Sequence, residues 1–128
     1  MSNTPRKFGL FRNARQPTVY PPNTTVFAAG DEGQEMYAIK RGKVAILVQG
    51  KVIDTLGEEE VFGEMALLER KARAATVVTL EETELVEINE TQFYLLVRQN
   101  PHFTLQLMRL LSERLRNTDE LYKKADGE

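Results

Sequence analysis

Short apolar segments separated by turn residues run from Thr24 to Ile88, and this spacing constrains the fold more than any other feature. The turn signals are Gly30-Asp31-Glu32-Gly33, Arg41-Gly42, Gly50-Lys51 and Gly57. Segments this short and this evenly interrupted are typical of an antiparallel sandwich or jelly roll. We therefore predict a mainly β fold with flanking helices, built as an antiparallel β-roll, also called a double-stranded β-helix.

The individual strands are predicted from their apolar runs. The runs cover residues 24–28, 36–40, 44–48, 52–56, 74–80 and 83–88. Within 44–48, β-branched residues (Val44, Ile46 and Val48) alternate with Ala45 and Leu47 at a period of two, as expected for a strand. Gly50-Lys51 predicts a tight type II′ hairpin turn with the glycine at its first central position. The last two runs predict a hairpin with Glu81-Glu82 at its tip.

Helical signals begin after the last strand. Asn89 is a plausible N-cap, and Gln92 stands in the capping-box position three residues later. This helix should end near Asn100-Pro101, because the residue before proline avoids helical backbone. A second, longer helix is expected over residues 102–124. The whole chain is thus divided into a basic arm or short helix (1–17), the β-roll (18–88), the C-terminal helices (89–124) and a tail (125–128).

The second helix carries two apolar stripes. One stripe, Phe103, Leu107 and Leu110, suits packing on the roll. The other resembles the seam of a two-stranded coiled coil and predicts a homodimer; it contains Met108, Leu111, Leu115, Thr118 and Tyr122. The alternative is that both stripes form one broad core face.

An anion-binding pattern lies at residues 62–77. Gly63 would let backbone approach a ligand closely, and the helix-forming run that follows would present unpaired N–H groups to it. Arg73 adds a planar fork of donors that can bind two phosphate oxygens. The carboxylate of Glu64 could accept hydrogen bonds from a sugar hydroxyl. Together these groups predict a pocket for a phosphorylated ribose, whereas in isolation each would be an ordinary turn, cap or surface residue.

The segments Phe62-Gly63-Glu64-x-Ala66-Leu67 and Arg73-Ala74-Ala75-Thr76-Val77 closely resemble the phosphate-binding cassette of cyclic-nucleotide-binding domains. That family includes protein kinase A regulatory subunits, gated channels and catabolite activator proteins. The resemblance implies that Glu64 binds the ribose 2′-hydroxyl and Arg73 the cyclic phosphate. It implies backbone contacts from Gly63, Met65, Ala66, Ala74 and Ala75.

The resemblance extends over about residues 19–115 and includes the β-roll framework. Two positions depart from the family pattern. Ala72 replaces the proline that usually precedes the arginine, which should loosen that turn. Glu59 stands where members often carry glycine, which suggests a different loop shape at the rim of the pocket.

The resemblance implies a non-catalytic sensor whose long helix responds to the ligand and signals to an effector protein that the sequence does not identify. Members selective for cGMP often carry threonine after the arginine; Ala74 therefore favours cAMP, with cGMP as the alternative ligand. Base contacts would come from the long helix, with Leu115, Leu121 and Tyr122 as candidates. The alternative function is a ligand-independent protein-interaction or dimerisation module on the same roll.

Composition argues against other functions. The chain has no cysteine and a single histidine, His102, too few for a cupin metal centre, and its two serines, Ser2 and Ser112, lie outside any nucleophile motif. We therefore expect no enzyme activity, metal or cofactor. A net charge of -2 and no segment after the long helix for a helix-turn-helix argue against binding to nucleic acid. Without a signal sequence or a long apolar run, we expect a cytoplasmic protein that does not enter membranes.

Overall fold

The computed structural model describes residues 17–125, with side chains described as far as residue 116. The chain divides into two compact units, with a boundary between Tyr94 and Leu95. Apart from Pro17, the predicted basic arm lies outside the described residues, as do positions 126–128 of the predicted tail. The unit that precedes the boundary contains the β-strands and a short helix.

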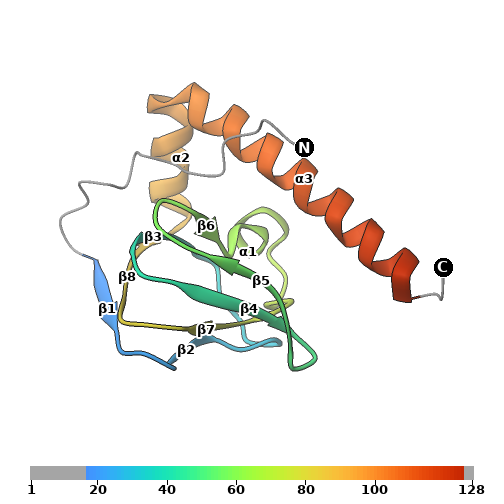
Figure 1. Cartoon of the computed structure of the whole chain (residues 1–128). Helices are drawn as coiled ribbons and strands as arrows, with labels where there is room; N and C mark the ends of the chain where they lie inside the picture. Colours follow the sequence, from blue (N-terminus) through green and yellow to red (C-terminus); the bar gives the residue numbers. More distant parts are fainter. Residues whose placement is uncertain (1–16, 126–128) are drawn as a thin grey trace. The chain divides into compact units, whose positions relative to one another are not determined.

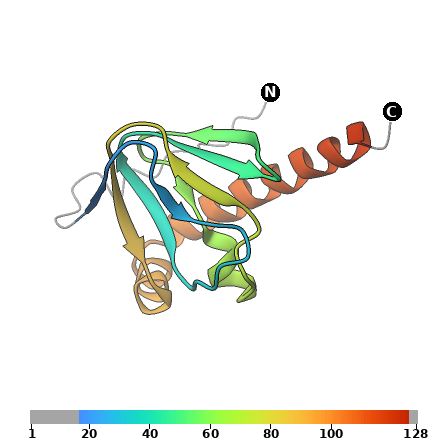
Figure 2. The same cartoon turned by 90° about the horizontal axis from the view of Figure 1, so that it is seen from below.

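Eight strands form two four-stranded antiparallel sheets (Figures 1 and 2). One sheet has the order β1-β8-β3-β6 and the other β2-β7-β4-β5. The strands are β1 (Thr18–Tyr20), β2 (Thr25–Phe27), β3 (Met36–Arg41), β4 (Val44–Val48), β5 (Lys51–Leu56), β6 (Val61–Phe62), β7 (Thr76–Thr79) and β8 (Thr83–Ile88). The predicted mainly β fold with an antiparallel roll is confirmed.

The roll closes around one apolar cluster. Its buried members are Tyr37, Ile39, Val44, Leu56, Phe62, Val77 and Leu85. The cluster draws on strands of both sheets, so the two sheets share a core between their inner faces, as expected for packed β layers. Each strand is too short to bury enough apolar surface alone, which makes the closed roll the stable arrangement.

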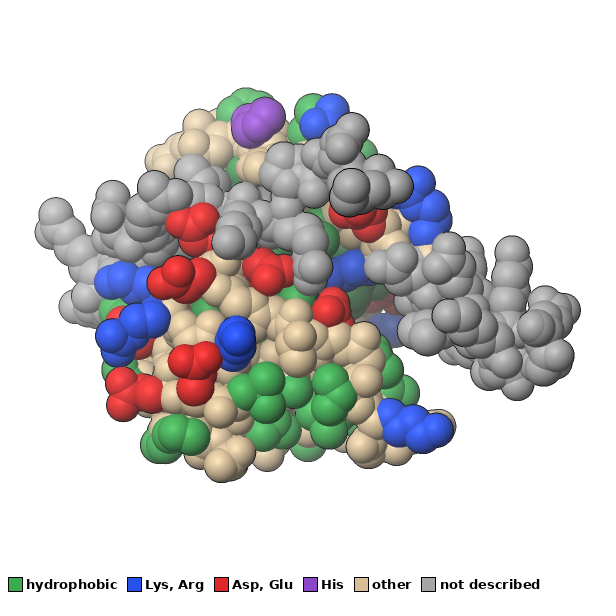
Figure 3. Space-filling view, in the orientation of Figure 1, with side chains coloured by type: hydrophobic (Ala, Val, Ile, Leu, Met, Phe, Trp, Pro, Cys, Tyr) green, Lys and Arg blue, Asp and Glu red, His purple; other side chains and the backbone are tan. Residues whose placement is uncertain are grey.

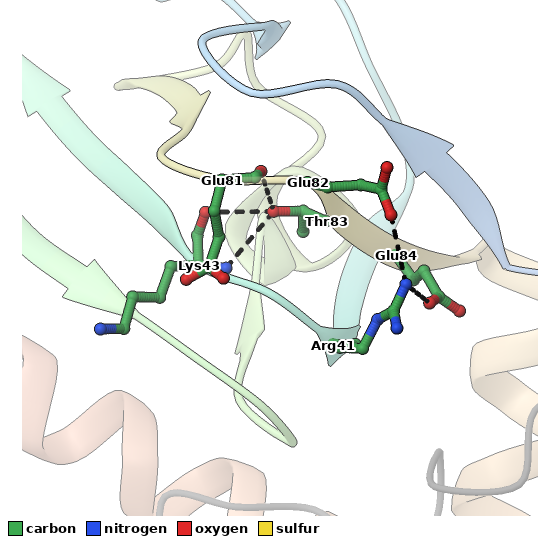
Figure 4. Close-up of polar contacts among 6 residues, drawn as sticks. All are labelled: Arg41, Lys43, Glu81, Glu82, Thr83 and Glu84. Carbon is green, nitrogen blue, oxygen red and sulfur yellow. Dashed lines mark hydrogen bonds and ion pairs between the residues drawn. The ribbon is translucent and has the colours of Figure 1, made fainter.

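The predicted hairpin between residues 74–80 and 83–88 is wrong. β7 pairs with β2 and β4, whereas β8 pairs with β1 and β3 in the other sheet. Thr83 explains the abrupt change: its hydroxyl is fully buried, accepts the Lys43 N–H at 3.3 Å and lies 2.8 Å from the Glu81 carbonyl oxygen, to which it can donate (Figure 4). These bonds hold the chain where it crosses from one sheet to the other.

At the same crossing between the sheets, Arg41 forms ion pairs with the two acidic residues on either side of Thr83. Its Nη2 lies 3.3 Å from Glu82 Oε1 and 2.6 Å from Glu84 Oε2 (Figure 4). Gly42 completes the corner, because its φ of +108° and the 2.5 Å that would separate an added Cβ from Thr83 Oγ1 leave no room for a side chain. The corner is therefore fixed by a residue without a Cβ and a buried hydroxyl.

The turn between β4 and β5 differs from the predicted type. Its central residues are Gln49 and Gly50, both with positive φ (51° and 77°), and Val48 pairs with Lys51. Positive φ at both central positions defines a type I′ turn, and the predicted Gly50-Lys51 type II′ turn is wrong. The type I′ turn matches the right-handed twist of the two strands.

Because glutamine adopts positive φ less readily than asparagine, we expect Gln49→Asn to stabilise the domain by about 0.5 to 1 kcal/mol. Thermal or denaturant unfolding would measure the gain. Gln34→Asn is the matched control, since Gln34 is exposed and has no positive φ. A gain that is absent at Gln49, or equal at both positions, would contradict this account of the turn.

Glu59 adopts the left-handed conformation (φ 67°) that would suit a glycine at this position. Backbone hydrogen bonds hold it there: the Glu59 N–H donates to the Ile39 carbonyl at 2.7 Å, and the Glu60 N–H donates to the Gly57 carbonyl at 3.1 Å. The predicted difference in loop shape is therefore wrong at this residue, because Glu59 takes the positive φ that a glycine would take. Tertiary hydrogen bonds impose the conformation on a residue that does not favour it.

The helices are α1 (Glu64–Glu69), α2 (Glu90–Gln99) and α3 (Pro101–Ala125). The predicted capping box is confirmed at the start of α2, where Asn89 Oδ1 accepts the Gln92 N–H and Gln92 Oε1 accepts the Asn89 N–H, both at 2.9 Å. On α3, Phe103, Leu107 and Leu110 are buried, whereas Met108 and Leu115 are exposed. The two predicted stripes therefore differ in burial.

Candidate anion-binding pocket

The pocket begins where β6 passes into α1. Gly63 lies between them with φ 78° and ψ 7°, the left-handed conformation that glycine adopts without steric cost. The first side chain of α1, Glu64, is buried, as are Ala66 and Leu67, while Met65 is exposed. The helix thus turns one face inward and leaves its backbone start next to Gly63.

Arg73 lies in the loop between α1 and β7, and its side chain reaches back to Gly63 at the start of α1. Its Nη1 donates to the carbonyl oxygen of Gly63 at 3.1 Å, and its Nη2 donates to that of Glu35 at 2.8 Å. The guanidinium carbon stands 4.1 Å from the centre of the Phe27 ring, a cation–π distance. Although arginine is rarely buried, Arg73 is only 6% exposed.

The backbone of Arg73 is also fixed. Its N–H donates to the Asp31 carbonyl at 2.9 Å, and its carbonyl accepts the Gly30 N–H at 2.8 Å. These bonds join the loop after α1 to the loop between β2 and β3. Arg73 is therefore held both at its backbone and at its guanidinium group.

Much of the charge on this guanidinium is not compensated by its hydrogen bonds. Both bonds go to neutral carbonyls, and the Glu35 carboxylate stands 3.7 Å from Nη2, beyond hydrogen-bonding distance. Nε is buried and makes no hydrogen bond to any described residue. A buried donor of this kind calls for an explanation, because buried polar groups are almost always paired. An anion bound at the guanidinium would supply the missing acceptor.

Two glycines make space for the guanidinium. A Cβ at Gly33 would stand 2.7 Å from Arg73 Nη2 and 2.8 Å from Nε, and one at Gly63 would stand 3.0 Å from Nη1. Gly33 needs no positive φ, so its role is steric. A side chain at Gly33 would collide with the guanidinium, and one at Gly63 would crowd it and also strain the left-handed backbone.

Aromatic rings form the wall beneath the arginine. The Tyr37 and Phe62 rings stack at 5.2 Å, and Phe27 lies 5.9 Å from each. Burial, together with the negative charge of Glu87, raises the pKa of Tyr37 to about 12. The phenol therefore stays protonated and neutral at ordinary pH, and it does not offset the positive charge of Arg73.

The structure brings three of the predicted site residues together at the start of α1. Gly63 and Arg73 are in direct contact, and Glu64 follows Gly63 at the first position of α1. Ala74 is exposed and Ala75 half-buried directly after Arg73, and the Ala66 N–H already donates to the Gly63 carbonyl at 3.3 Å. Leu115, in the second unit, is 64% exposed. The side chains of the other two predicted base contacts, Leu121 and Tyr122, lie outside the described residues.

Sequence reasoning missed the residues that hold Arg73. None of them was predicted to contact the arginine: Asp31 and Gly33 appeared in a turn, Phe27 within the strand over residues 24–28, and Glu35 in no prediction. The one signal was the pair of glycines around Asp31, which indicates a tight loop but gives no partner. Glu35 and Arg73 are 38 positions apart in the sequence, and only the tertiary fold brings them into contact.

Other kinds of site find no support in the part of the chain that the structure describes. It contains no cluster of three or more His, Cys, Asp or Glu residues that could hold a metal. None of its helices combines the length and apolar character needed to cross a bilayer. On the face seen in Figure 3, acidic and basic side chains are interspersed instead of gathering into one basic patch.

Comparison with known proteins points to one family. Residues 17–100 match the family model of the cyclic nucleotide-binding domain. The Cyclic AMP receptor protein of Thermus thermophilus is 34% identical over 120 residues, covering 90% of this chain and 56% of that protein. The chain spans about half the length of this relative, and it also covers 49% of the CRP-like cAMP-activated global transcriptional regulator of Mycobacterium tuberculosis.

Solved structures agree with the sequence match. The catabolite activator protein of Thermus thermophilus superposes with a TM-score of 0.77 at 34% identity, covering 87% of this chain and 55% of that one. A structure of Sp-2Cl-cAMPS bound to PKAR CBD2 gives a TM-score of 0.71 at 25% identity, with 83% and 70% of the two chains covered. The chain therefore belongs to the cyclic nucleotide-binding domain family.

Proposed function

We propose that this domain binds a cyclic nucleotide at the pocket around Arg73 and acts as a non-catalytic sensor. One observation carries the proposal: a buried guanidinium held by neutral carbonyls, with its Nε N–H directed to no acceptor among the described residues. A cyclic phosphate carries one negative charge and exposes two oxygens. Those oxygens suit the planar donors of an arginine better than the point charge of a lysine.

The remaining contacts follow the family pattern. Glu64 would accept the ribose 2′-hydroxyl from the first position of α1, next to the glycine that Arg73 contacts. Backbone groups of Gly63, Met65, Ala66, Ala74 and Ala75 would line the phosphate. Because the Ala66 N–H now donates to the Gly63 carbonyl, its use for a ligand would require that bond to lengthen or be shared.

Calorimetric titration of the full chain with cAMP and with cGMP tests the proposal. We expect heat of binding with saturation at one nucleotide per chain. A chain that gives no heat with either nucleotide at millimolar concentration would contradict the sensor function and leave the ligand-independent interaction module as the better description.

We propose cAMP as the preferred ligand. Ala74, directly after the arginine, offers no hydroxyl to a guanine amino group, and a relative is named Cyclic AMP receptor protein. Supplying a hydroxyl at this position should therefore shift the preference toward cGMP.

Ala74→Thr should raise the affinity for cGMP about fivefold, since a net hydrogen bond contributes about 1 kcal/mol. Affinity for cAMP should change less. Competition between the two nucleotides would measure the ratio. Ala72→Thr, an exposed position on the other side of Arg73, is the matched control and should leave the ratio unchanged. A ratio that is also unchanged in Ala74→Thr would contradict the assigned position of the base.

The output is proposed to pass through α3. A ligand shifts a conformational equilibrium only by its differential affinity for the two states, so the nucleotide must affect the helices as well as the roll. Met108 and Leu115 are 62% and 64% exposed and would form the seam of a homodimer. Sedimentation of the full chain with and without cAMP tests the seam, and a monomer under both conditions would remove the homodimer from the proposal.

A further inference from the structure

Glu35 contacts Arg73 through two different groups. Its backbone carbonyl accepts a hydrogen bond from Nη2 at 2.8 Å, and its side-chain Oε1 lies 3.7 Å from the same nitrogen. The second distance is too long for a hydrogen bond, so the carboxylate acts on the guanidinium as a nearby charge. The Arg73 side chain is 3% exposed and the Glu35 side chain 29%.

The carboxylate is kept near the arginine by its surroundings. Its other oxygen, Oε2, accepts the backbone N–H of Gln34 at 3.3 Å. The next residue, Met36, is fully buried at the start of β3, which fixes the backbone of Glu35. The carboxylate therefore stands beside the guanidinium with a hydrogen bond of its own to the loop backbone.

We propose that Glu35 sets the affinity of the pocket by competing with the ligand phosphate for Arg73. This inference rests on the proposed function. A carboxylate at 3.7 Å partly offsets the charge that attracts a phosphate, and it also repels the phosphate directly. Both effects lower affinity, and both come from the charge of the Glu35 side chain.

The alternative role for Glu35 is to position Arg73. Its backbone carbonyl already does so through the 2.8 Å bond from Nη2, and the Gly63 carbonyl holds Nη1. Neither bond depends on the side chain of Glu35. Removing the charge while keeping the shape should therefore leave the arginine in place, and the two roles predict opposite effects on affinity.

The test is Glu35→Gln, titrated with cAMP beside the native chain. We expect about three- to fivefold tighter binding, the upper end of what a partly exposed charge interaction contributes. Glu32→Gln is the matched control, because it removes the same charge from an exposed residue of the same loop and should change affinity by less than about twofold. Raising the salt concentration should reduce the difference in cAMP affinity between Glu35→Gln and the native chain, since salt screens the charge of Glu35.

The possible results distinguish a failure of the Glu35 proposal from a failure of the proposed cyclic-nucleotide binding. If the native chain binds cAMP and Glu35→Gln binds equally or more weakly, the competing role is wrong and the proposed function stands. Equal tightening in Glu32→Gln would also overturn the inference, because the effect would then be one of net charge. If the native chain and both variants bind neither nucleotide, the proposed function itself fails.

Discussion

Arg73→Ala is expected to weaken cAMP binding by about 2 to 5 kcal/mol, which corresponds to a loss of thirtyfold or more. The guanidinium is buried, so a bound phosphate would interact with it away from water, where charge-assisted hydrogen bonds are strong. Truncation would leave the ligand phosphate facing neutral carbonyls. Titration calorimetry of the native chain and the variant measures the loss.

Two further variants separate the charge from its geometry. Arg70→Ala removes an exposed arginine of the same segment, one that pairs with Glu90 at 2.8 Å, and should leave affinity within about twofold of the native chain. Arg73→Lys keeps the charge but loses the planar fork, so its affinity should lie between those of the native chain and Arg73→Ala. Native-like binding by Arg73→Ala would refute the assignment of the pocket.

Gly33→Ala is expected to weaken cAMP binding by about tenfold to a hundredfold through steric displacement of the arginine. The added Cβ would stand 2.7 Å from Nη2 and 2.8 Å from Nε, closer than a Cβ comes to such atoms in real structures. The guanidinium has little room to retreat, because it lies over Phe27 and is bonded to the carbonyls of Gly63 and Glu35. Losing a charged hydrogen bond costs about 1.5 to 3 kcal/mol.

Gly57→Ala is the matched control for this prediction. The nearest atom to a Cβ at Gly57 is the Gly42 carbonyl oxygen at 3.9 Å, an ordinary contact, and its φ is not in the left-handed range. Thermal unfolding without ligand should be measured for both variants, because overpacking can also destabilise the fold. A Gly33→Ala variant that binds as tightly as Gly57→Ala would show that Arg73 need not occupy its observed position.

Together these variants distinguish roles within the pocket. Removing the arginine or displacing it should weaken binding, whereas removing the Glu35 charge should strengthen it. A pocket that merely needs positive charge would respond to Arg70→Ala and to Glu32→Gln as well. Opposite signs at Arg73 and Glu35, with both controls unchanged, would support a specific phosphate site.

Local patterns in the sequence predicted much of the architecture. The capping box at Asn89 and Gln92 was predicted correctly because its hydrogen bonds join residues three positions apart. Six of the eight strands followed from turn residues and short apolar runs, which report local preferences, whereas β1 and the two-residue β6 were not among the predicted runs. The family resemblance followed from two short segments, 62–67 and 73–77, whose residue types are recognisable without a structure.

Errors arose where distant parts of the chain decide the conformation. β7 and β8 are separated by a short turn, yet they join different sheets, and Glu59 takes a left-handed conformation because Ile39 accepts its N–H. The turn at Gln49 and Gly50 took its type from the twist of the paired strands. Each outcome depends on hydrogen bonds or pairing that no local propensity describes.

The sequence by itself determined that the chain contains a mainly β domain with a glycine, a carboxylate and an arginine at a recognisable spacing. Only the tertiary structure decided that the arginine is buried, that Gly33 leaves space for it, that Phe27 lies beneath it and that the Glu35 carboxylate partly offsets its charge. The physical reason is that the electrostatics of a charged group are set by its burial and its neighbours. Those neighbours come from segments about ten to forty-five residues away, and folding alone brings them together.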